Sequence, residues 1–418
     1  MTGIATNSVA VIGGGIVGVS CALFLNRQGF RTTLIEKTAP GRETSYGNAG
    51  AVSQASFIPI NSPRILRSLH RFATNKTNSV RYDPAYLARN AGWMARFLLG
   101  ARRNSFLKAA DEMSAFAYRS RDVHLELARQ ARVDHRFRDT GWMKLYRSQA
   151  GFDASREDQE LMRSHGVGYD VLGPEELSEI EPHLKPIYAG AVLITSASNV
   201  DSPGGVTEAY AALFEAEGGI IQSQQVQRIN PSGDGFTVVT DQGSAGFAQV
   251  VVAAGPWSAD LLKPLGYNIP MAYERGYHQH FQVRDGQTLY RACNDIEGAF
   301  SISPMERGIR VTSGIQFAER DAPPDYSQIQ AIFPAAEQAI SLGSAVENQP
   351  WSGSRPSLPD TRPVIGAAAR HKGLWMAFGH GHIGFGTGPI TGKLLAQMVA
   401  EKPTDIAVDI FRPARFGA

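Results

Sequence analysis

The sequence predicts an α/β fold in which a parallel sheet covered by helices receives an inserted second domain of α+β type. Two observations support this prediction. The chain opens with an apolar strand, a glycine-rich turn and an apolar helix, and residues 273–317 alternate apolar and polar residues as antiparallel strands do. With 418 residues, the chain is long enough for two domains and a large core.

The first element is a strand that ends at Ile12 and leads into a turn. The turn reads Gly13-Gly14-Gly15-Ile16-Val17-Gly18 and matches the G-x-G-x-x-G fingerprint of dinucleotide-binding domains. In that fingerprint the first glycine permits a tight turn, the second admits the pyrophosphate, and the third lets helix and strand pack closely. The free N–H groups of the helix N-terminus face the phosphates. We therefore expect a dinucleotide to contact Gly13, Gly15, Ile16, Val17 and Gly18.

The next strand ends in an acidic residue. Gly29 lies where a helix C-cap glycine is expected, and residues 30–35 form a short β-rich run. Glu36 follows Gly13 by 23 positions, close to the spacing of a ribose-binding acid. Its carboxylate would accept hydrogen bonds from a free 2′-hydroxyl and repel a 2′-phosphate. NADP is therefore disfavoured, NAD and FAD both remain compatible, and we assign Lys37 to the same cofactor site.

The composition excludes several classes of protein. The 41 basic and 39 acidic residues give a formal charge of +2, which argues against a dedicated nucleic-acid binder. Cys21 and Cys293 lie far apart, form neither a disulfide framework nor a metal cluster, and suit a reducing compartment, with Cys21 in the core of the first helix. No signal-peptide pattern and no apolar run of roughly 20 residues is present. We expect a cytoplasmic protein.

The remaining elements follow from composition and periodicity. Pro and Gly residues open one predicted helix, and a proline stands near the start of the last one. The predicted elements are helices over 64–137, strands and turns over 142–197, a helix over 203–216, strands over 236–240 and 249–254, and a last helix over 389–400.

This order implies a discontinuous organisation, because nucleotide-type segments recur at the start, middle and end of the chain. We assign the nucleotide-binding domain to residues 1–60, 198–265 and 350–418. The substrate domain is assigned to residues 61–197 and 266–349.

Four further segments carry a resemblance to a known family. They read Glu-Thr-Ser-Tyr-Gly-Asn-Ala-Gly over 43–50, Val-Val-Val-Ala-Ala-Gly-Pro-Trp-Ser over 250–258, Trp-Ser-Gly-Ser-Arg-Pro-Ser-Leu-Pro-Asp over 351–360, and Gly-His-Gly-His-Ile-Gly over 379–384. Together with the first turn, their order resembles the FAD-dependent D-amino-acid dehydrogenase branch of the D-amino-acid oxidase and glycine oxidase family. The resemblance covers nearly the whole chain, and it is specific to the family rather than to a substrate.

The resemblance implies FAD, with a Rossmann-like FAD-binding domain of the glutathione-reductase type. Because no cysteine occurs near the segment where covalently flavinylated relatives carry one, the FAD is expected to be dissociable. His380 and His382 have no third ligand at metal-site spacing, so we expect no metal. The N-terminus of the last helix would stabilise negative charge on the reduced flavin. Further implied cofactor contacts are Ser45, Gly47, Asn48, Ala49, Gly50, Val226, Ala254, Gly255, Trp257, Gly379, His380, Gly381, His382, Ile383 and Gly384.

The reaction that the resemblance implies is oxidation of a D-amino acid to an imino acid, by hydride transfer from the α-carbon to flavin N5. Arg355 matches the arginine of the family's Gly-x-Arg-Pro segment, and a guanidinium can clamp a carboxylate with two hydrogen bonds. Tyr277 and His278 are further candidates for substrate contact, although strand alternation would point only one of them inward. Tyr46 could flank the flavin ring, and Arg275 could be a second clamp.

The electron acceptor and partners stay open at this stage. The leading hypothesis passes electrons to a quinone or another non-oxygen acceptor, with D-proline-like and hydroxy-D-proline-like substrates included. The alternatives are a glycine or sarcosine oxidase that uses oxygen, a flavin subunit of a multi-subunit electron-transfer dehydrogenase, and a regulatory NAD-binding protein. Residues 86–106 are amphipathic, basic and aromatic, which suits peripheral attachment to the inner face of the cell membrane. A helix packed on the substrate domain explains the same pattern.

Overall fold

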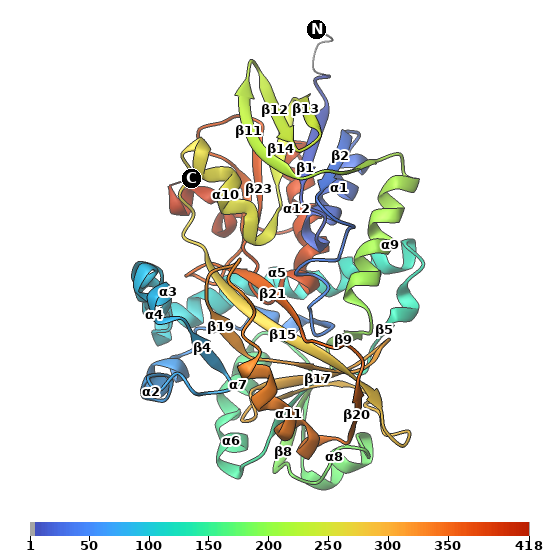
Figure 1. Cartoon of the computed structure of the whole chain (residues 1–418), viewed down its shortest axis with the longest axis vertical. Coiled ribbons are helices and arrows are strands. Elements are labelled where there is room, and N and C mark those ends of the chain that lie inside the picture. Colours follow the sequence, from blue (N-terminus) through green and yellow to red (C-terminus); the bar gives the residue numbers. More distant parts are fainter. Residues whose placement is uncertain (1–4, 418) are drawn as a thin grey trace.

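The computed structural model describes residues 5–417, and a six-stranded sheet forms its upper half in Figure 1. Neighbouring strands pair in parallel, except for the antiparallel pair β22–β23. The sheet draws its strands from three distant stretches of sequence. In spatial order they are β10 (Ile220–Ser223), β2 (Arg31–Glu36), β1 (Ser8–Ile12), β14 (Gln249–Val252), β23 (Leu374–Phe378) and β22 (Val364–Ala367).

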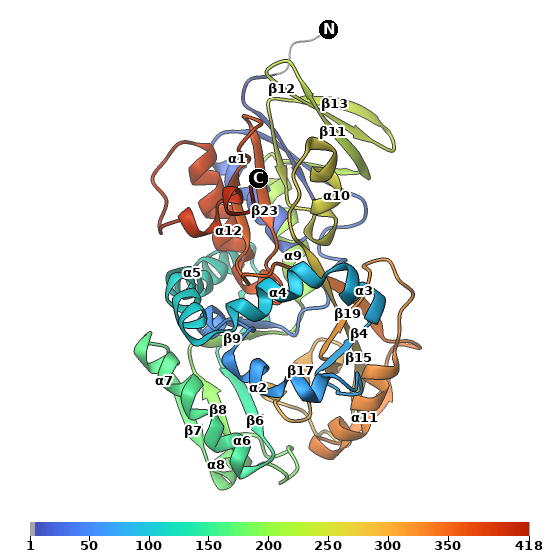
Figure 2. The same ribbon diagram turned by 90° about the vertical axis from the view of Figure 1, so that its left-hand side faces the viewer.

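Both faces of this sheet are covered, as the apolar run from Val9 to Ile12 in β1 requires. Val9 and Val11 pack with helices α1 (Ile16–Arg27), α9 (Pro203–Ala216) and α12 (Gly384–Val399). Ala10 and Ile12, on the other face, pack with a small antiparallel sheet of β11 (Val226–Ser232), β12 (Gly235–Thr240) and β13 (Gly243–Phe247). Figure 2 shows α1 and α12 on one side of β23 and the small sheet on the other. The alternation along β1 thus builds three layers.

Two sequence predictions about these helices are confirmed and one is wrong. The helix over 203–216 forms with the predicted bounds, and Cys21 is fully buried in α1. The last helix begins at Gly384 rather than Pro389. A proline inside a helix leaves the carbonyl four residues earlier without its N–H partner. Here that carbonyl belongs to Phe385 and lies 3.1 Å from His124 Nε2, which supplies the missing hydrogen bond.

The second main sheet fills the lower half of Figure 1. Its long central strand, β15, pairs on its two edges with β18 and β19 and with β20 and β21. The pairings are antiparallel except for β16–β6 and β19–β4. In spatial order the strands are β4 (Val80–Tyr82), β19 (Ile315–Phe317), β15 (Ala272–Val283), β18 (Gly308–Thr312), β17 (Phe300–Met305), β16 (Ala292–Asp295), β6 (Trp142–Tyr146), β8 (Gly190–Ile194) and β7 (Tyr169–Leu172), with β20 (Leu342–Ala345) and β21 (Trp351–Ser357) on β15.

The strands predicted over 273–317 are present, whereas two other segments differ from expectation. The stretch predicted as helical contains β4, which pairs with β19. The stretch predicted as strands and turns also forms three short helices. These and the other helices are α2 (Pro63–Phe72), α3 (Pro84–Arg89), α4 (Ala91–Gly100), α5 (Arg103–Gln130), α6 (Gln149–Ala154), α7 (Arg156–Ser164), α8 (Pro174–Ile180), α10 (Ser258–Leu262) and α11 (Ser327–Ala339).

Two connections tie the halves of the molecule together. The strand β21 lies in the stretch assigned to the nucleotide domain, yet it pairs along β15 in the large sheet. The helix α5, assigned to the substrate domain, packs against α12. A third small sheet consists of β3 (Ala51–Ser53), β9 (Ala197–Val200) and β5 (Phe137–Arg138), in that spatial order.

Candidate active site

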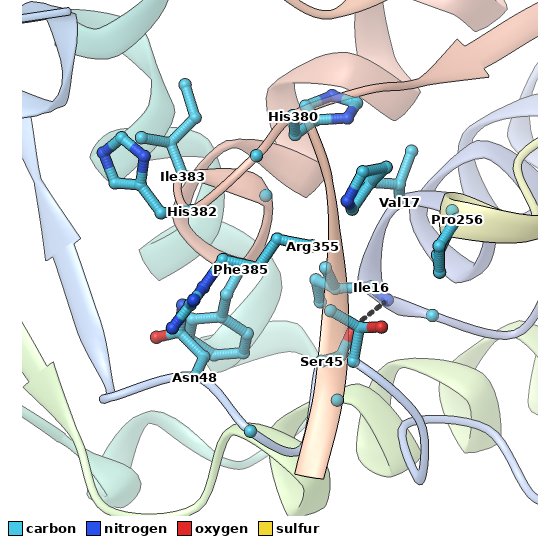
Figure 3. Close-up of a pocket in the computed structure, with 18 of the residues that line it drawn as sticks. Ile16, Val17, Ser45, Asn48, Pro256, Arg355, His380, His382, Ile383 and Phe385 are labelled. Carbon is cyan, nitrogen blue, oxygen red and sulfur yellow. Dashed lines mark hydrogen bonds between the residues drawn. The ribbon is translucent and has the colours of Figure 1, made fainter. Parts of the chain in front are cut away.

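A cavity of about 1010 Å³ is lined by residues of both main sheets. This volume is at the upper end of the range for small-molecule sites. Every predicted cofactor residue lines it except Gly18 and Gly50. Figure 3 shows Ile16, Ser45, Arg355 and His382 around this space, although they come from four distant parts of the chain.

The glycine-rich turn forms one wall of the cavity. Gly13 has a φ of +111°, and its N–H donates to Ile35 O at 2.9 Å. A Cβ on Gly18 would lie 1.8 Å from Gly13 O, so helix α1 and strand β1 can pack only with glycine there. Gly18 therefore acts through packing, as the fingerprint predicts. The N–H of Ile16, at the N-terminus of α1, donates to Ser45 Oγ at 3.0 Å.

The acid after the second strand lies beside the same turn. The Glu36 carboxylate accepts hydrogen bonds from Gly14 N–H and, at 3.1 Å, from Thr38 N–H. It lines the cavity together with Lys37 and Trp257. Lys37 Nζ lies 3.7 Å from the centroid of the Trp257 ring, as in a cation–π contact. These contacts fix the end of the cavity where a ribose and adenine would bind.

The loop over 43–50 crosses the cavity and is held from below by β17 and β18. Arg310 Nη1 donates to Tyr46 O at 3.0 Å and to Asn48 O at 2.6 Å, and Ser303 Oγ donates to Ala49 O at 2.9 Å. Gly50, outside the cavity wall, receives a hydrogen bond from Val200 N–H. The loop backbone is therefore fixed by side chains of the large sheet.

Arg310 is in turn oriented by a buried histidine. Its Nε lies 2.9 Å from His280 Nε2, and because arginine can only donate, that ring nitrogen must accept. The ring proton is then on Nδ1, which donates to Glu347 Oε1 at 2.6 Å. Burial and the Arg310 charge lower the pKa of His280 to about 4, so the ring stays neutral near pH 7.

The Gly-His-Gly-His-Ile-Gly segment joins β23 to α12, and all six residues line the cavity. Thr391 donates its hydroxyl proton to Thr387 O, so its oxygen accepts from His380 Nε2 at 2.9 Å. Burial lowers the pKa of His380 to about 3. His380 thus ties the loop to α12 as a neutral hydrogen-bond donor. No group of three or more possible metal ligands occurs in residues 5–417.

Arg355 lines the cavity from β21, and its guanidinium lies against the backbone of Gly276. A Cβ on Gly276 would be 2.6 Å from Arg355 Nη2. Arg355 Nη1 is buried and has no hydrogen-bond partner among the described residues. Burial lowers the pKa of Arg355, and the charge of Glu274, its register partner on β15, opposes that shift. A buried guanidinium with a free donor is suited to bind a carboxylate.

The other substrate-contact candidates are placed differently. Tyr277 borders the cavity, but its hydroxyl donates to Gln316 and accepts from Asp325 N–H. His278 is buried outside the lining, stacked on Trp351 with ring centroids 4.8 Å apart, and Tyr46 lies beside both rings. Arg275 donates to Pro323 O and does not line the cavity. His278 has two ring nitrogens without a partner among the described residues, but only Arg355 combines a free polar atom with a place in the cavity lining.

Sequence reasoning missed a row of residues on the large sheet. Trp351 lies over Gly47 and Gly353, where no Cβ could fit. It shares one sheet face with four polar residues that also line the cavity. Trp351 is paired with His278 across β21 and β15, and the four residues continue this row of paired positions on the other side of His278. These residues are Thr312, Ser301, Asn294 and Lys144. Their sequence segments show alternation, but nothing in the sequence gives the strand order that aligns them.

The residues present fit a dinucleotide with a flat redox-active ring. The turn at Gly13 and the N-terminus of α1 offer phosphate contacts, and Glu36 offers a ribose contact. The helix α12 begins at the cavity, where its positive end would stabilise an anionic ring. Neither Cys21 nor Cys293 lines the cavity, in keeping with a dissociable group.

Comparison with known proteins agrees with this geometry. The family model described as FAD dependent oxidoreductase (DAO) matches residues 8–398. A D-amino-acid oxidase from Bradyrhizobium diazoefficiens is 31% identical over 98% of each chain. A D-amino acid dehydrogenase from Allorhizobium ampelinum is 28% identical, covering 95% of this chain and 96% of the relative.

Solved structures show the same fold. Glycine oxidase from Geobacillus kaustophilus superposes with a TM-score of 0.76 at 21% identity, covering 97% of this chain and 98% of that chain. L-proline dehydrogenase from P. horikoshii superposes with a TM-score of 0.74 at 20% identity, covering 99% and 98%. The chain belongs to the DAO family of FAD-dependent oxidoreductases, and FAD is its cofactor.

Proposed function

We propose that this protein is a D-amino-acid dehydrogenase, which oxidises a D-amino acid to its imino acid for release as the 2-oxo acid and ammonia. The observation that carries the proposal is the free, buried Nη1 of Arg355 in the cavity that holds the FAD residues. A carboxylate is the ligand that such a guanidinium binds best. The relatives named D-amino-acid oxidase and D-amino acid dehydrogenase support the D-enantiomer as the substrate.

The protein groups have three tasks in this reaction. Bound FAD would supply the hydride acceptor, flavin N5, for the hydrogen on the substrate α-carbon. Arg355 fixes the carboxylate, and the glycine backbone at 276 and 353 leaves room for the substrate beside it. Trp351 and the loop over 379–384 enclose the site and limit water.

The first experiment is the visible spectrum of the purified, FAD-loaded protein during anaerobic addition of D- and L-amino acids. D-Proline and 4-hydroxy-D-proline belong in the panel, because cyclic substrates are included in the proposal. Flavin bands that bleach with D-enantiomers are expected. Bleaching only by glycine or sarcosine would replace the proposal with the secondary-amine oxidase.

The proposed acceptor is a quinone or another non-oxygen acceptor, and two relatives named D-amino acid dehydrogenase support it. Reduction of a soluble quinone during turnover, with little hydrogen peroxide in air, is the expected result. Stoichiometric peroxide would favour an oxidase. Activity that requires an added partner protein would favour a flavin subunit of a larger complex.

We also propose peripheral attachment to the inner face of the cell membrane, but through a surface that differs from the predicted one. In the segment 86–106 the aromatic residues Tyr86, Trp93, Phe97 and Phe106 are buried. The exposed apolar residues are Leu66 (37%), Leu69 (42%) and Leu99 (49%), on α2 and α4. Figure 2 shows both helices in front of the large sheet.

The charge of this region suits an anionic bilayer. Residues 62–110 contain ten Lys and Arg and one acid, Asp83, and no residue of α2 is buried. No helix in residues 5–417 is long and apolar enough to span a membrane. The protein should co-sediment with anionic but not neutral vesicles. The double variant Leu66→Ser, Leu69→Ser should weaken this binding, whereas Val283→Ser, an exposed apolar control, should not.

A further inference from the structure

The large sheet carries a row of polar side chains along the cavity. Strand register aligns Lys144 with Asn294, Asn294 with Ser301, and Ser301 with Thr312. All four line the cavity, and they share a sheet face with Trp351 and Arg355. At the spacing of neighbouring strands, the row extends about 14 Å from Thr312 to Lys144. We call these four residues the polar strip.

The strip offers hydrogen-bonding groups that the protein itself leaves free. Thr312 Oγ1 is buried without a partner, and Asn294 and Ser301 side chains make no hydrogen bond among the described residues. Among the described residues, the only polar contact of Lys144 Nζ is with Asp158 Oδ2, at 3.3 Å. An apolar ligand covering these groups would leave them unpaired and without water, which disfavours its binding. A ligand that fills this part of the cavity must therefore be polar.

The charges at the Lys144 end of the strip favour a ligand group that accepts hydrogen bonds. Asp158 already has both carboxylate oxygens in use, one at Lys144 and one at Arg64 Nη2, 3.1 Å away. Two cations and one anion thus line this end. The Lys144 ammonium keeps two N–H donors that no described residue accepts. Oxygen acceptors, and carboxylates above all, match these free donors.

We propose that the polar strip is the side-chain subsite of the substrate and selects amino acids whose side chains carry oxygen acceptors, with an anionic end bound at Lys144. This inference rests on the proposed function, because it assumes that Arg355 holds the α-carboxylate. Short hydroxylated side chains reach Thr312 and Ser301. Longer acidic side chains reach Asn294 and Lys144.

The test is a binding titration that needs no turnover. Changes in the flavin spectrum of the FAD-loaded protein report binding of straight-chain dicarboxylates and of monocarboxylates with the same number of carbons. One carboxylate binds Arg355 in both series, and only the dicarboxylates can also reach the strip. Beyond a threshold chain length, the dicarboxylate should bind at least about tenfold more tightly. Equal affinities at every length would overturn the proposal.

Three variants locate the effect. Lys144→Met should abolish the preference for dicarboxylates, and Lys144→Arg should retain most of it. Asp158→Asn removes a negative charge that repels the second carboxylate of the ligand. It should therefore strengthen dicarboxylate binding a few-fold, the opposite of the effect of Lys144→Met. Lys108→Met, an exposed lysine on α5, is the matched control. A preference that persists in Lys144→Met would place the second carboxylate elsewhere and overturn the assignment.

Turnover then separates this inference from the proposed function. The native enzyme should have a higher kcat/KM for a D-2-aminodicarboxylic acid above the threshold chain length than for the D-amino acid of the same length that ends in a methyl group. Oxidation of D-amino acids with no such preference would retain the function and reject the strip. Dicarboxylate preference in a protein that oxidises no D-amino acid would retain the strip and reject the function.

Discussion

The two walls of the cavity differ in how their polar groups are satisfied. On the nucleotide side, Ile16 N–H is paired with Ser45, and the backbone of the loop over 43–50 accepts hydrogen bonds from Arg310, which reaches it from β18 of the large sheet. On the wall formed by the large sheet, Arg355 Nη1 and Thr312 Oγ1 are buried with no partner among the described residues. One wall is assembled from backbone and internal hydrogen bonds, and the other presents free side chains.

This difference indicates what each wall has to recognise. A cofactor that stays bound through many turnovers is best served by a site that is rigid before binding. A substrate wall must keep donors free for a ligand that enters and leaves. Damage to the paired groups that hold the nucleotide wall, Arg310 included, should therefore affect folding and FAD, whereas damage to the free side chains of the sheet wall should affect the substrate alone.

The largest effect is expected at the helix–strand crossing on the nucleotide wall. In Gly18→Ala the new Cβ would lie 1.8 Å from Gly13 O, a backbone atom that cannot move without opening the turn. We expect a protein that is insoluble or free of FAD, measured by the flavin absorbance of the purified protein. The matched control is Gly92→Ala, in helix α4 with open space around the new Cβ, which should gain up to about 1 kcal/mol of stability. Normal flavin content in Gly18→Ala would show that this crossing tolerates a side chain.

The next largest effect is expected at Arg355. Arg355→Leu removes the carboxylate clamp and leaves every nucleotide contact intact, so FAD content and spectrum should stay native. KM should rise by orders of magnitude, because a charged bidentate pair is lost. Anaerobic stopped-flow reduction over a range of D-amino-acid concentrations measures this. Native KM in the variant would remove the main assignment of the sheet wall.

A smaller effect should follow from loosening the loop over 43–50. Arg310→Lys keeps the charge but has one donor nitrogen, which cannot occupy both the Nε position that faces His280 and the Nη1 position that faces Tyr46 O and Asn48 O. We expect FAD to bind about tenfold more weakly, measured by fluorescence recovery on dilution, with a lowered melting temperature. Arg284→Lys, an exposed arginine beyond β15, is the control. If both variants hold FAD equally well, the buried pairing of Arg310 does not support the cofactor wall.

The two walls of the cavity also differ in how far the sequence predicts them. Cofactor residues lie in short contiguous stretches, such as Gly13–Gly18 and Gly379–Gly384, because turns and helix ends act through local geometry. The start of α12 was misplaced because the partner of the Phe385 carbonyl, His124, lies 261 residues away. A local pattern contains no trace of that contact.

The substrate wall was less predictable because it depends on strand order. Lys144, Asn294 and Ser301 become neighbours only once β6, β16 and β17 are aligned, and β16 pairs in parallel with a strand about 150 residues earlier. Alternation also left Tyr277 and His278 equally eligible, and neither exposes a free polar group to the cavity. Arg355 could be chosen because the family resemblance, not the periodicity, pointed to it.

The smallest effect near neutral pH comes from the histidines that hold the cofactor wall, which make stability depend on pH only in acidic solution. Burial lowers the pKa of His124 to about 4 and of His380 to about 3, and burial with Arg310 lowers that of His280 to about 4. Because the unfolded chain binds protons near pH 6.5 and the folded chain does not, these groups lower stability as pH falls from about 6.5 to 4. Above pH 6.5 their contribution should be constant.

Denaturant unfolding at a series of pH values measures this slope, to which each histidine can add up to about 1.4 kcal/mol per pH unit. His124→Gln can still donate to Phe385 O, so it should fold, with a shallower slope between pH 4 and 6.5. If the slope is the same in His124→Gln and in the native protein, the buried ring of native His124 contributes nothing to the pH dependence of stability. The cofactor wall would then be more adaptable than its internal pairing indicates.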